Sequence, residues 1–456
     1  MNYADDPAIA ESLSFNLISK SLRKDSRSIH NRLCSISNDS EFVLAVASAY
    51  QLPLIANERC GRWYIPSNQI YDSVYFKSTD GHTDNWEFNL RRLNLHILDS
   101  VISKKGIIIV DSTRRGKRMP DSLSKTIPIW CAVLNRAIFT YSDRKVGTKI
   151  VHLPPLSVSA SERDQIATRI DGWTQDFINC GIDIEKLRNQ VDKPLRPIWV
   201  YPDDSLLLPP HKPEYTDIYP IILCTASRMV LDGAERQGYT YVQGAADDHE
   251  GWASSITPEV FWRNREVLLN STDAEIEHLI EQDLLSTLPS TAASPEIAAI
   301  ADTGIYIGRK ISEYDYDDLD VKFQYIVDLS TTASKPSPRR HVFYKPLPDG
   351  KKGSKIFRTI LPRLLDFITT SDNHLVFDKS NLLILCDTGQ DFCVGLALAI
   401  LSLFFDEDGK PYAERTETRI DKDVVRKRLT FLLLQKRVNP SRATLVSVNS
   451  VLMGWT

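Results

Sequence analysis

The sequence lacks the features that mark export, membrane insertion or zinc binding. Among its 456 residues, no apolar run approaches the roughly eighteen residues that a membrane-spanning helix needs. The amino-terminal segment is acidic and has neither a basic region nor an apolar core, which argues against a signal or transit peptide. The seven cysteines include no CxxC pair, which excludes a zinc ribbon and makes a disulfide framework unexpected. These absences predict a cytoplasmic protein with no membrane partner.

The chain also lacks a strong net charge, but its basic residues are concentrated in three segments. The formal net charge is −4, yet residues 104–118 carry six Lys or Arg, residues 335–358 eight and residues 422–442 seven, each with a single acid. Any one of these segments alone is more often a solvated face. Several basic surfaces on an acidic body together predict an extended anionic partner that is held through its phosphates.

The length and the pattern of apolar runs predict an α/β protein of two or three domains. A helix is expected over about residues 13–34, and Asp39-Ser40-Glu41 is expected to begin another. The proline-rich segment 334–348 predicts a boundary between a large N-terminal α/β domain, residues 1–333, and a C-terminal α/β domain, residues 334–456. Strand candidates alternate with helical patterns, which favours a partly parallel sheet; they are residues 52–55, 63–65, 107–110, 197–201, 221–225, 239–242, 323–327 and 382–385.

One apolar run, Ile107 to Val110, ends abruptly in a polar, cationic loop. Four cations within five positions repel one another and need an anion between them, for which phosphate is the best match. Pro120 follows and predicts a helix start. The alternative is a solvated surface turn. The predicted phosphate-binding residues are Ser112, Thr113, Arg114, Arg115, Lys117 and Arg118, and Asp111 is a predicted catalytic residue.

Two further polar segments supply candidates for catalysis and for metal binding. Asp80 and His82 lie in a polar, cation-flanked motif, so either is a candidate general base. Asp247, Asp248 and Glu250 follow Gly244, and their oxygens suit Mg²⁺, which needs only one or two carboxylates when it is bound to pyrophosphate. An equally open interpretation has these acids capping the helix that follows.

Near the C-terminus, a buried strand, a small-residue loop and an apolar helix follow one another. The loop resembles the phosphate loop of the dual-specificity and tyrosine phosphatases, in which a cysteine is followed six residues later by arginine. Here Phe392 stands six residues after Cys386, and Leu385 stands where a histidine would precede it. Phosphatase catalysis is therefore not expected, whereas anion binding by the backbone is. A purely structural turn is the alternative. The residues predicted to form this loop are Cys386, Thr388, Gly389, Asp391 and Gly395.

Five long blocks resemble the initiator tRNA 2′-O-ribosyl phosphate transferases of fungi and plants. The blocks are YFKSTDGHTDNWEFNLRRLN (75–94), DSTRRGKRMPDSLSKTIPIWCAVLNR (111–136), YVQGAADDHEGWASSITPEVFW (241–262), CDTGQDFCVGLALAI (386–400) and NPSRATLVSVNSVLM (439–453). The resemblance implies a glycosyltransferase that moves a 5-phosphoribosyl group from phosphoribosyl pyrophosphate to the 2′-hydroxyl of nucleotide 64 in the T stem of initiator methionine tRNA. It also implies a C-terminal domain like that of a dual-specificity phosphatase.

That chemistry fits the candidate residues. Displacement at the anomeric carbon passes through an oxocarbenium-like state, which Asp111 is expected to stabilise while the cationic loop holds the leaving pyrophosphate. Mg²⁺ is expected with this donor, and neither zinc nor an organic cofactor is. Two alternatives from other classes are a non-catalytic tRNA-binding protein and a phospho-adaptor with a degenerate phosphatase loop.

Overall fold

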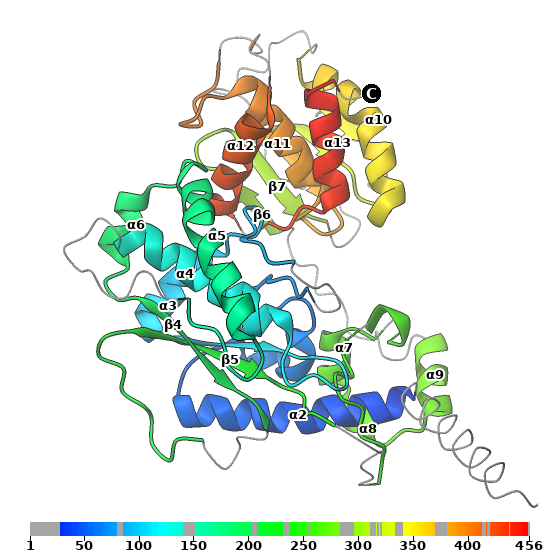
Figure 1. Ribbon diagram of the computed structural model, residues 1–456. Helices are drawn as coiled ribbons and strands as arrows, with labels where there is room; N and C mark the ends of the chain where they lie inside the picture. Colours follow the sequence, from blue (N-terminus) through cyan, green and yellow to red (C-terminus); the bar gives the residue numbers. More distant parts are fainter. Residues whose placement is uncertain are drawn as a thin grey trace, which may run out of the picture. The chain divides into compact units, whose positions relative to one another are not determined.

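The chain forms two compact α/β units, each built on a five-stranded sheet (Figure 1). The first unit combines Met1–Asn89, Asn94–Ile178 and Asp183–Leu288, and the second combines Leu90–Leu93, Asn179–Ile182 and Pro289–Thr456. The predicted α/β class is confirmed. The computed structural model describes residues 28–79, 85–139, 151–202, 208–230, 238–247, 249–253, 256–282, 296–310, 316, 319, 322–332, 341–369, 381–412, 416, 420–436 and 438–454.

The sheet of unit 1 is entirely parallel, in the order β2-β1-β3-β5-β4. Its strands are β1 Leu54–Asn57, β2 Ile70–Val74, β3 Ile107–Asp111, β4 Leu195–Val200 and β5 Tyr219–Thr225. Its helices are α2 Ile29–Tyr50, α3 Leu98–Lys104, α4 Ile127–Phe139, α5 Ala160–Ile178, α6 Ile184–Gln190, α7 Pro258–Arg263, α8 Arg265–Leu269 and α9 Asp273–Glu281. Short turns are η1 Gly61–Tyr64, η2 Ser67–Gln69, η3 Leu95–Ile97, the π-helical η4 Ser122–Thr126 and η6 His249–Gly251.

Helices cover both faces of this sheet, as a parallel sheet requires. Ile108 and Val110 of β3 point to one face, where they join a core with Leu33 and Ile36 of α2. Figure 1 shows α2 running beneath β4 and β5, with α4 and α5 on the other side. All five residues of β3 are buried, because the strand lies in the middle of the sheet and is covered on both faces.

The first helix differs from the prediction. The described part of α2 is one continuous helix from Ile29 to Tyr50, and Ser28 caps it by accepting a hydrogen bond from Asn31 N at 3.1 Å. Asp39 therefore begins no second helix. Its side chain is buried and accepts a hydrogen bond from the Tyr241 hydroxyl at 2.8 Å, a partner that is distant in sequence. The predicted positions 13–27 lie outside the described residues.

The sheet of unit 2 has the order β6-β7-β10-β8-β9, in which only β6 is antiparallel to its neighbour. Its strands are β6 Glu296–Ala299, β7 Ile305–Arg309, β8 Phe323–Asp328, β9 His341–Tyr344 and β10 Asn381–Cys386. Its helices are α10 Gly350–Thr369, α11 Phe392–Phe404, α12 Lys422–Gln435 and α13 Arg442–Leu452.

Four helices pack against one face of this sheet. Ile307, Val327 and Ile384 belong to the same core cluster as the apolar side chains of α10 to α13, and every residue of α11 is buried. The other face carries a smaller cluster around Tyr316 and Phe323. Although α11 is strongly apolar, none of the helices in the described ranges is long and apolar enough to cross a membrane.

The predicted boundary at residue 334 falls inside unit 2. β10 pairs with β7 on one side and with β8 on the other, and both of those strands precede residue 334. The C-terminal sheet thus needs residues from 296 onward, and the division between the units lies near Leu288 and Pro289. Two strand predictions were also wrong, because residues 63–65 overlap the 3₁₀ turn η1 and residues 239–242 form no named strand.

Candidate functional site

Polar side chains from several strands collect at the carboxyl edge of the unit 1 sheet. β1, β3 and β5 are parallel neighbours that end at Asn57, Asp111 and Thr225. The chain runs from β1 to β2 on one side and to β3 on the other, so the strand order reverses between β1 and β3. Ligands of open α/β sheets bind outside the carboxyl ends of the strands at such a point. The crevice after β1 and β3 is therefore the candidate site.

Asp111 lies at the centre of this edge with both carboxylate oxygens engaged. Its side chain is fully buried. Oδ1 accepts hydrogen bonds from Arg59 Nη2 (2.9 Å), Cys60 Sγ (3.0 Å) and Ser112 N (2.8 Å). Oδ2 accepts hydrogen bonds from Asn57 Nδ2 (2.8 Å), Arg59 Nε (3.3 Å) and the Ser122 hydroxyl. We call Asp111, these side-chain donors and Asp247 the Asp111 cluster.

The predicted contact between Asp111 and the reacting sugar does not agree with this geometry. A side chain without exposed surface cannot touch a substrate, and its lone pairs are already used. Burial raises the pKa of the Cys60 thiol well above its ordinary value, so the thiol stays protonated and donates to Asp111. Asp111 instead fixes the position of the residues around it, of which Arg59 matters most.

Arg59 is the functional candidate that the sequence analysis missed. Its guanidinium bridges Asp111 and Asp247, with Nη1 at 2.5 Å from Asp247 Oδ1, and also donates to the Ser112 carbonyl. Burial alone would lower the pKa of Arg59, but the Asp111 and Asp247 carboxylates raise it by more, so the group stays charged. The side chain is 23% exposed, which leaves part of it open to a ligand. The sequence signal for Arg59 was its position just after the end of β1. That position points to the site only when β1 is known to lie beside β3, which the sequence does not show.

The four cations of the loop after β3 have different surroundings. Arg114 and Arg115 are exposed, and neither has an ion-pair partner in the part of the chain that the structure describes. Lys117 pairs with Asp121 at 3.1 Å, and Arg118 lies over the Tyr201 ring, 4.8 Å from its centroid. The two arginines at the tip of the loop are therefore the strongest candidates to bind an incoming anion.

Ser112 and Thr113 are interior residues, contrary to the prediction that their hydroxyls bind phosphate. Both are fully buried. The backbone of Thr113 is held by the Ser227 hydroxyl, which donates to Thr113 O at 3.2 Å. These two residues connect the buried strand to its exposed cationic tip and do not face solvent themselves.

Gln243 and Gly244 hold the cationic loop from the opposite side. Gln243 Oε1 accepts a hydrogen bond from Gly116 N at 3.1 Å, and its Nε2 donates to Lys117 O at 2.6 Å. Gly244 has φ of +63°, and a Cβ on it would overlap the Thr113 carbonyl. Glycine is thus required here both by the backbone conformation and by the close approach of the two loops.

Of the three acids predicted to bind Mg²⁺, the structure describes the side chain of Asp247 alone. Asp247 is ion-paired with Arg59, Asp248 lies outside the described residues, and Glu250 belongs to η6. The described residues contain no group of three or more His, Cys, Asp or Glu side chains that could hold a metal. Mg²⁺ remains a prediction that rests on the chemistry of the donor.

Asp80 and His82, the candidate bases, also lie outside the described residues. The chain is anchored on both sides of them. Thr79 donates to Asp121 Oδ2 at 3.1 Å, and Trp86 Nε1 donates to Glu162 Oε1 at 2.8 Å. Lys125 is close to both acids, at 3.6 Å from Asp121 and 2.7 Å from Glu162. Thr79 and Trp86, which stand on either side of the two candidates, are therefore both linked through these acids to Lys125 of η4.

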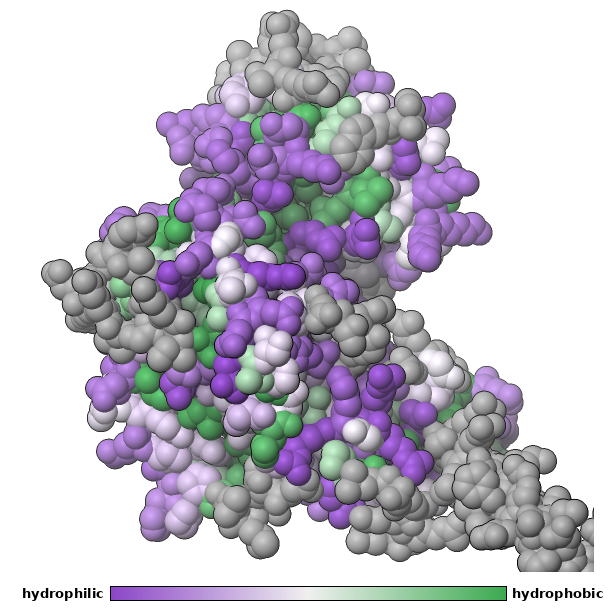
Figure 2. All heavy atoms as spheres, in the orientation of Figure 1, coloured by the Kyte–Doolittle hydropathy of each residue, from purple (hydrophilic) through white to green (hydrophobic). Residues whose placement is uncertain are grey.

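The three basic segments of the sequence are not three continuous surfaces. Residues 104–118 are divided by the buried strand β3, which places Lys104 and Lys105 at the opposite edge of the sheet from Arg114 and Arg115. On α12, Arg426 and Lys427 are paired with Asp423 and Glu407. On α10, exposed cations follow one face, and Figure 2 shows hydrophilic residues along its outer side; they are Lys351, Lys352, Lys355, Arg358 and Arg363.

The loop after β10 in unit 2 has the predicted arrangement of strand, tight turn and helix. Gly389 has φ of +65°, and a Cβ there would lie 2.9 Å from the Arg309 backbone. Cys386 Sγ is 3.1 Å from Cys393 Sγ and 3.7 Å from Thr388 Oγ1. The hydrogen bond from the Cys393 thiol, with smaller contributions from backbone N–H groups and Thr388, lowers the pKa of Cys386 to about 6 although burial opposes this.

Phe392 shows why this loop lacks the cationic clamp of a phosphatase. Its side chain is buried and packs against Phe357, with ring centroids 5.5 Å apart. Asp391 Oδ1 accepts a hydrogen bond from Ser441 N at 2.8 Å, and a Cβ on Gly395 would lie 2.6 Å from Thr444. These residues join the loop to α13 and the core. The loop thus offers backbone N–H groups and the exposed Thr388 side chain to an anion, but no cation.

Comparison with known proteins covers both units. Residues 22–285 match the family model described as the Rit1 N-terminal domain, and residues 341–452 match the Rit1 DUSP-like domain. A Schizosaccharomyces pombe protein, described as uncharacterized protein C3F10.06c, is 37% identical over 93% of this chain and 94% of its own length. The Saccharomyces cerevisiae tRNA A64-2′-O-ribosylphosphate transferase is 36% identical over 97% of this chain and 95% of its own length.

Among solved structures, the Yvh1 phosphatase domain from Chaetomium thermophilum aligns with 12% identity, covering 36% of this chain and 97% of its own. The TM-score of 0.24 is too low to support an argument, so the phosphatase-like character of the C-terminal unit rests on the family model. The family match spans both units, and the identity to two fungal proteins extends over nearly all of the chain. The protein therefore belongs to the Rit1 family, which includes the tRNA A64-2′-O-ribosylphosphate transferase of Saccharomyces cerevisiae.

Proposed function

We propose that this protein transfers a 5-phosphoribosyl group from phosphoribosyl pyrophosphate to the 2′-hydroxyl of nucleotide 64 in initiator methionine tRNA. The observation that carries the proposal is the 36% identity, over 97% of the chain, to a protein named as a transferase of this kind. The added group brings bulk and negative charge to the T stem, which would keep the tRNA out of elongation. A cytoplasmic location goes with this role and stays a prediction.

The cationic loop and the Asp111 cluster support the proposed donor site. Arg114 and Arg115 are exposed and lack carboxylate partners among the described residues, so they are available to a pyrophosphate. Arg59 lies between the two carboxylates that orient it and offers a further charge at the same edge of the sheet. Charges held in place before the donor arrives stabilise a leaving group without reorganisation.

In the proposed reaction, the tRNA 2′-oxygen forms a bond to the anomeric carbon of the donor. The bond from that carbon to the pyrophosphate breaks, and the pyrophosphate leaves with the electron pair toward Arg114 and Arg115. The proton of the 2′-hydroxyl passes to a base, for which Asp80 and His82 remain the candidates. Mg²⁺ would neutralise charge on the pyrophosphate.

The test is transfer of label from radioactive donor to purified initiator tRNA, with elongator methionine tRNA as the comparison. Label on initiator tRNA alone, at position 64, is the expected outcome. Binding of initiator tRNA without transfer would favour the non-catalytic RNA-binding alternative. Failure to bind either tRNA, together with phosphate binding by the C-terminal unit, would favour the phospho-adaptor. Equal label on both tRNAs would refute initiator specificity while leaving the transferase activity in place.

A further inference from the structure

A cavity of about 460 Å³ opens in unit 1 at the amino edge of the sheet, opposite the Asp111 cluster. Lys104 and Lys105 precede β3, Lys193 precedes β4, and Pro220 lies at the start of β5. The five residues of β3 separate the two edges by roughly 16 Å at about 3.3 Å per residue. The cavity is therefore distinct from the candidate donor site.

Four lysines from three segments converge on this cavity: Lys104, Lys105, Lys193 and Lys212. In the described part of the chain, none of the four has a carboxylate within ion-pair distance. Lys104 lies over the Tyr71 ring at 5.4 Å, and Lys193 lies over the Tyr219 ring at 5.8 Å. These two rings are not among the residues that line the cavity, but they stabilise two of the cations although like charges repel. Such an arrangement favours an anion between them.

Lys105 has a backbone conformation that is unfavourable for a residue with a side chain. Lys105 is the C-cap of α3 and has φ of +62°, a left-handed conformation that glycine adopts without strain. A side chain in this conformation costs stability relative to glycine, and Lys105 is one of the residues that line the cavity.

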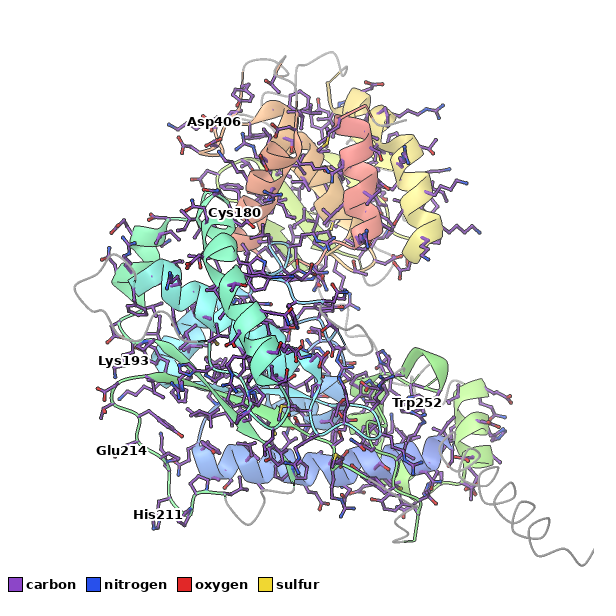
Figure 3. All side chains as sticks on the ribbon, viewed as in Figure 1. Cys180, Lys193, His211, Glu214, Trp252 and Asp406 are labelled. Atoms are coloured by element: carbon purple, nitrogen blue, oxygen red, sulfur yellow. The ribbon has the colours of Figure 1, made fainter. Side chains whose placement is uncertain are left out.

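The remaining wall is suited to a nucleoside. Pro213 and Tyr215 are partly exposed and give apolar surface, whereas Tyr50 and Pro220 are buried. Glu214 adds an acceptor that has no ion pair among the described residues. Figure 3 shows Lys193 and Glu214 on the same side of unit 1. Aromatic faces stack with bases whatever their sequence, and carboxylates accept hydrogen bonds from ribose hydroxyls. The volume is in the range of small-ligand sites and too small for a duplex.

We infer that this cavity binds one phosphorylated nucleoside, with its phosphate on the lysines and its base against the tyrosine and proline wall. The nucleotide comes either from an unpaired part of a bound tRNA or from free solution. The tRNA source rests on the proposed function, whereas the free nucleotide does not. Since the cavity lies at the other edge of the sheet from the cationic loop, a tRNA nucleotide held here would be remote from the one that is modified.

The experiment compares Lys212→Ala and Lys105→Gly with Lys186→Ala, an exposed lysine of α6 outside the cavity. Labelled initiator tRNA is titrated by fluorescence anisotropy at several salt concentrations, and adenosine monophosphate by calorimetry. Each cavity variant should lower the affinity for one of the two ligands by about three- to tenfold. If that ligand is tRNA, the slope of log affinity against log salt concentration should fall by about 0.7–0.9. The Lys186→Ala variant should match the wild type with both ligands.

Lys105→Gly separates binding from folding, because it should raise the thermal midpoint while it weakens binding. If the variants lose affinity for tRNA but keep their affinity for adenosine monophosphate, the bound nucleotide belongs to the tRNA. If they lose affinity for adenosine monophosphate alone, the cavity binds a free nucleotide. The inference is overturned if both cavity variants bind like Lys186→Ala, or if the wild type binds neither ligand. If the protein transfers label normally but the lysine variants bind both ligands like the wild type, the cavity proposal is refuted and the proposed function stands. If nucleotide binding depends on the lysines but no transfer occurs, the proposed function is refuted and the cavity proposal stands.

Discussion

The loop after β3 in unit 1 and the loop after β10 in unit 2 hold equivalent places in two five-stranded sheets. β3 lies between β1 and β5, and β10 lies between β7 and β8. Each strand is buried, each loop contains a glycine with positive φ, and each leads into an apolar helix, α4 or α11. The same architecture thus presents backbone N–H groups beside a helix start in both units.

The two loops differ in where their charges lie. In unit 1, Arg114 and Arg115 are exposed at the tip, and the carboxylate of Asp111 is buried behind them. In unit 2, Phe392 packs into the core, and Asp387 accepts hydrogen bonds from Thr331. A strand-loop-helix frame therefore does not define an anion site by itself. Exposed cations determine whether such a loop can bind an anion. Among the described residues of these two loops, the exposed cations belong to unit 1.

The largest expected effect comes from breaking the buried ion pair in each unit. Arg59→Ala removes the cation that neutralises Asp111. Lys310→Met removes the cation that neutralises Asp328, whose side chain is also fully buried. Leaving a buried charge unpaired costs about 3–5 kcal/mol. Both variants should lower the free energy of unfolding by this order, but only Arg59→Ala should also reduce transfer in the folded protein.

Two probes can assign each loss to its unit. Seven of the eight tryptophans lie between residues 63 and 262, in unit 1, so tryptophan fluorescence follows that unit while far-ultraviolet circular dichroism follows both. Arg59→Lys keeps a charge but cannot reach Asp111 and Asp247 together, and should rescue stability only in part. A urea midpoint for Arg59→Ala equal to that of the wild type would show that the Asp111 cluster does not stabilise unit 1.

The second prediction compares two glycines with positive φ that hold the cationic loop. A Cβ at Gly244 would overlap the Thr113 carbonyl, whereas a Cβ at Gly116 has nothing within 4 Å. Gly116→Ala therefore carries only the backbone cost of about 1–2 kcal/mol, and Gly244→Ala adds an overlap that costs about 1–3 kcal/mol more. Urea unfolding followed by tryptophan fluorescence measures both. Equal losses would mean that the loops separate to admit the methyl group.

The third prediction concerns the exposed cations. Arg115→Ala should lower kcat/KM for the donor by roughly ten- to a hundredfold, as expected for about 1.5–3 kcal/mol from a charge-assisted hydrogen bond. Affinity for tRNA should change much less. Arg118→Ala is the matched control, because Arg118 is already placed over Tyr201. Normal donor kinetics with poor tRNA binding would move this loop from the donor site to the tRNA site.

The sequence predicted the parts of the fold that depend on continuous burial. β3, β5 and β10 were found because central parallel strands are apolar throughout, whereas β2, β6, β7 and β9 were missed. Of these, β2 and β9 carry exposed side chains at the sheet edges. The candidate loops were found for the same reason, since each follows a strong strand. Which of their side chains face inward was not predictable, because the burial of Asp111 depends on Arg59, fifty-two residues away.

The fourth prediction concerns the Cys386 and Cys393 pair of unit 2. The pKa of Cys386 is about 6 in the folded protein, below its ordinary value of 9.0, so between these values the unfolded thiol binds a proton that the folded thiolate does not. Stability of unit 2 should therefore rise with pH above 6, by up to about 1.4 kcal/mol per unit, and should be lost as the pH falls through 6. Cys393→Ala removes the donor and should flatten the slope between pH 6 and 8. An unchanged slope in urea unfolding would contradict this.

The smallest expected effect is on transfer itself in Cys386→Ser. Serine keeps the size of the side chain, so the loop and its backbone N–H groups should keep their shape. Phe392 lies in the core where a phosphatase would have its arginine, and nothing else in the described loop can clamp a phosphoryl group. Transfer to initiator tRNA should stay within about twofold of the wild type, since less than ~0.5 kcal/mol is at stake, while Arg115→Ala in the same assay shows the effect of a donor-site loss. Complete loss of transfer in Cys386→Ser, with normal tRNA binding and an unfolding midpoint unchanged at pH 6, where the thiolate adds little stability, would instead identify Cys386 as a catalytic thiol and place part of the chemistry in unit 2.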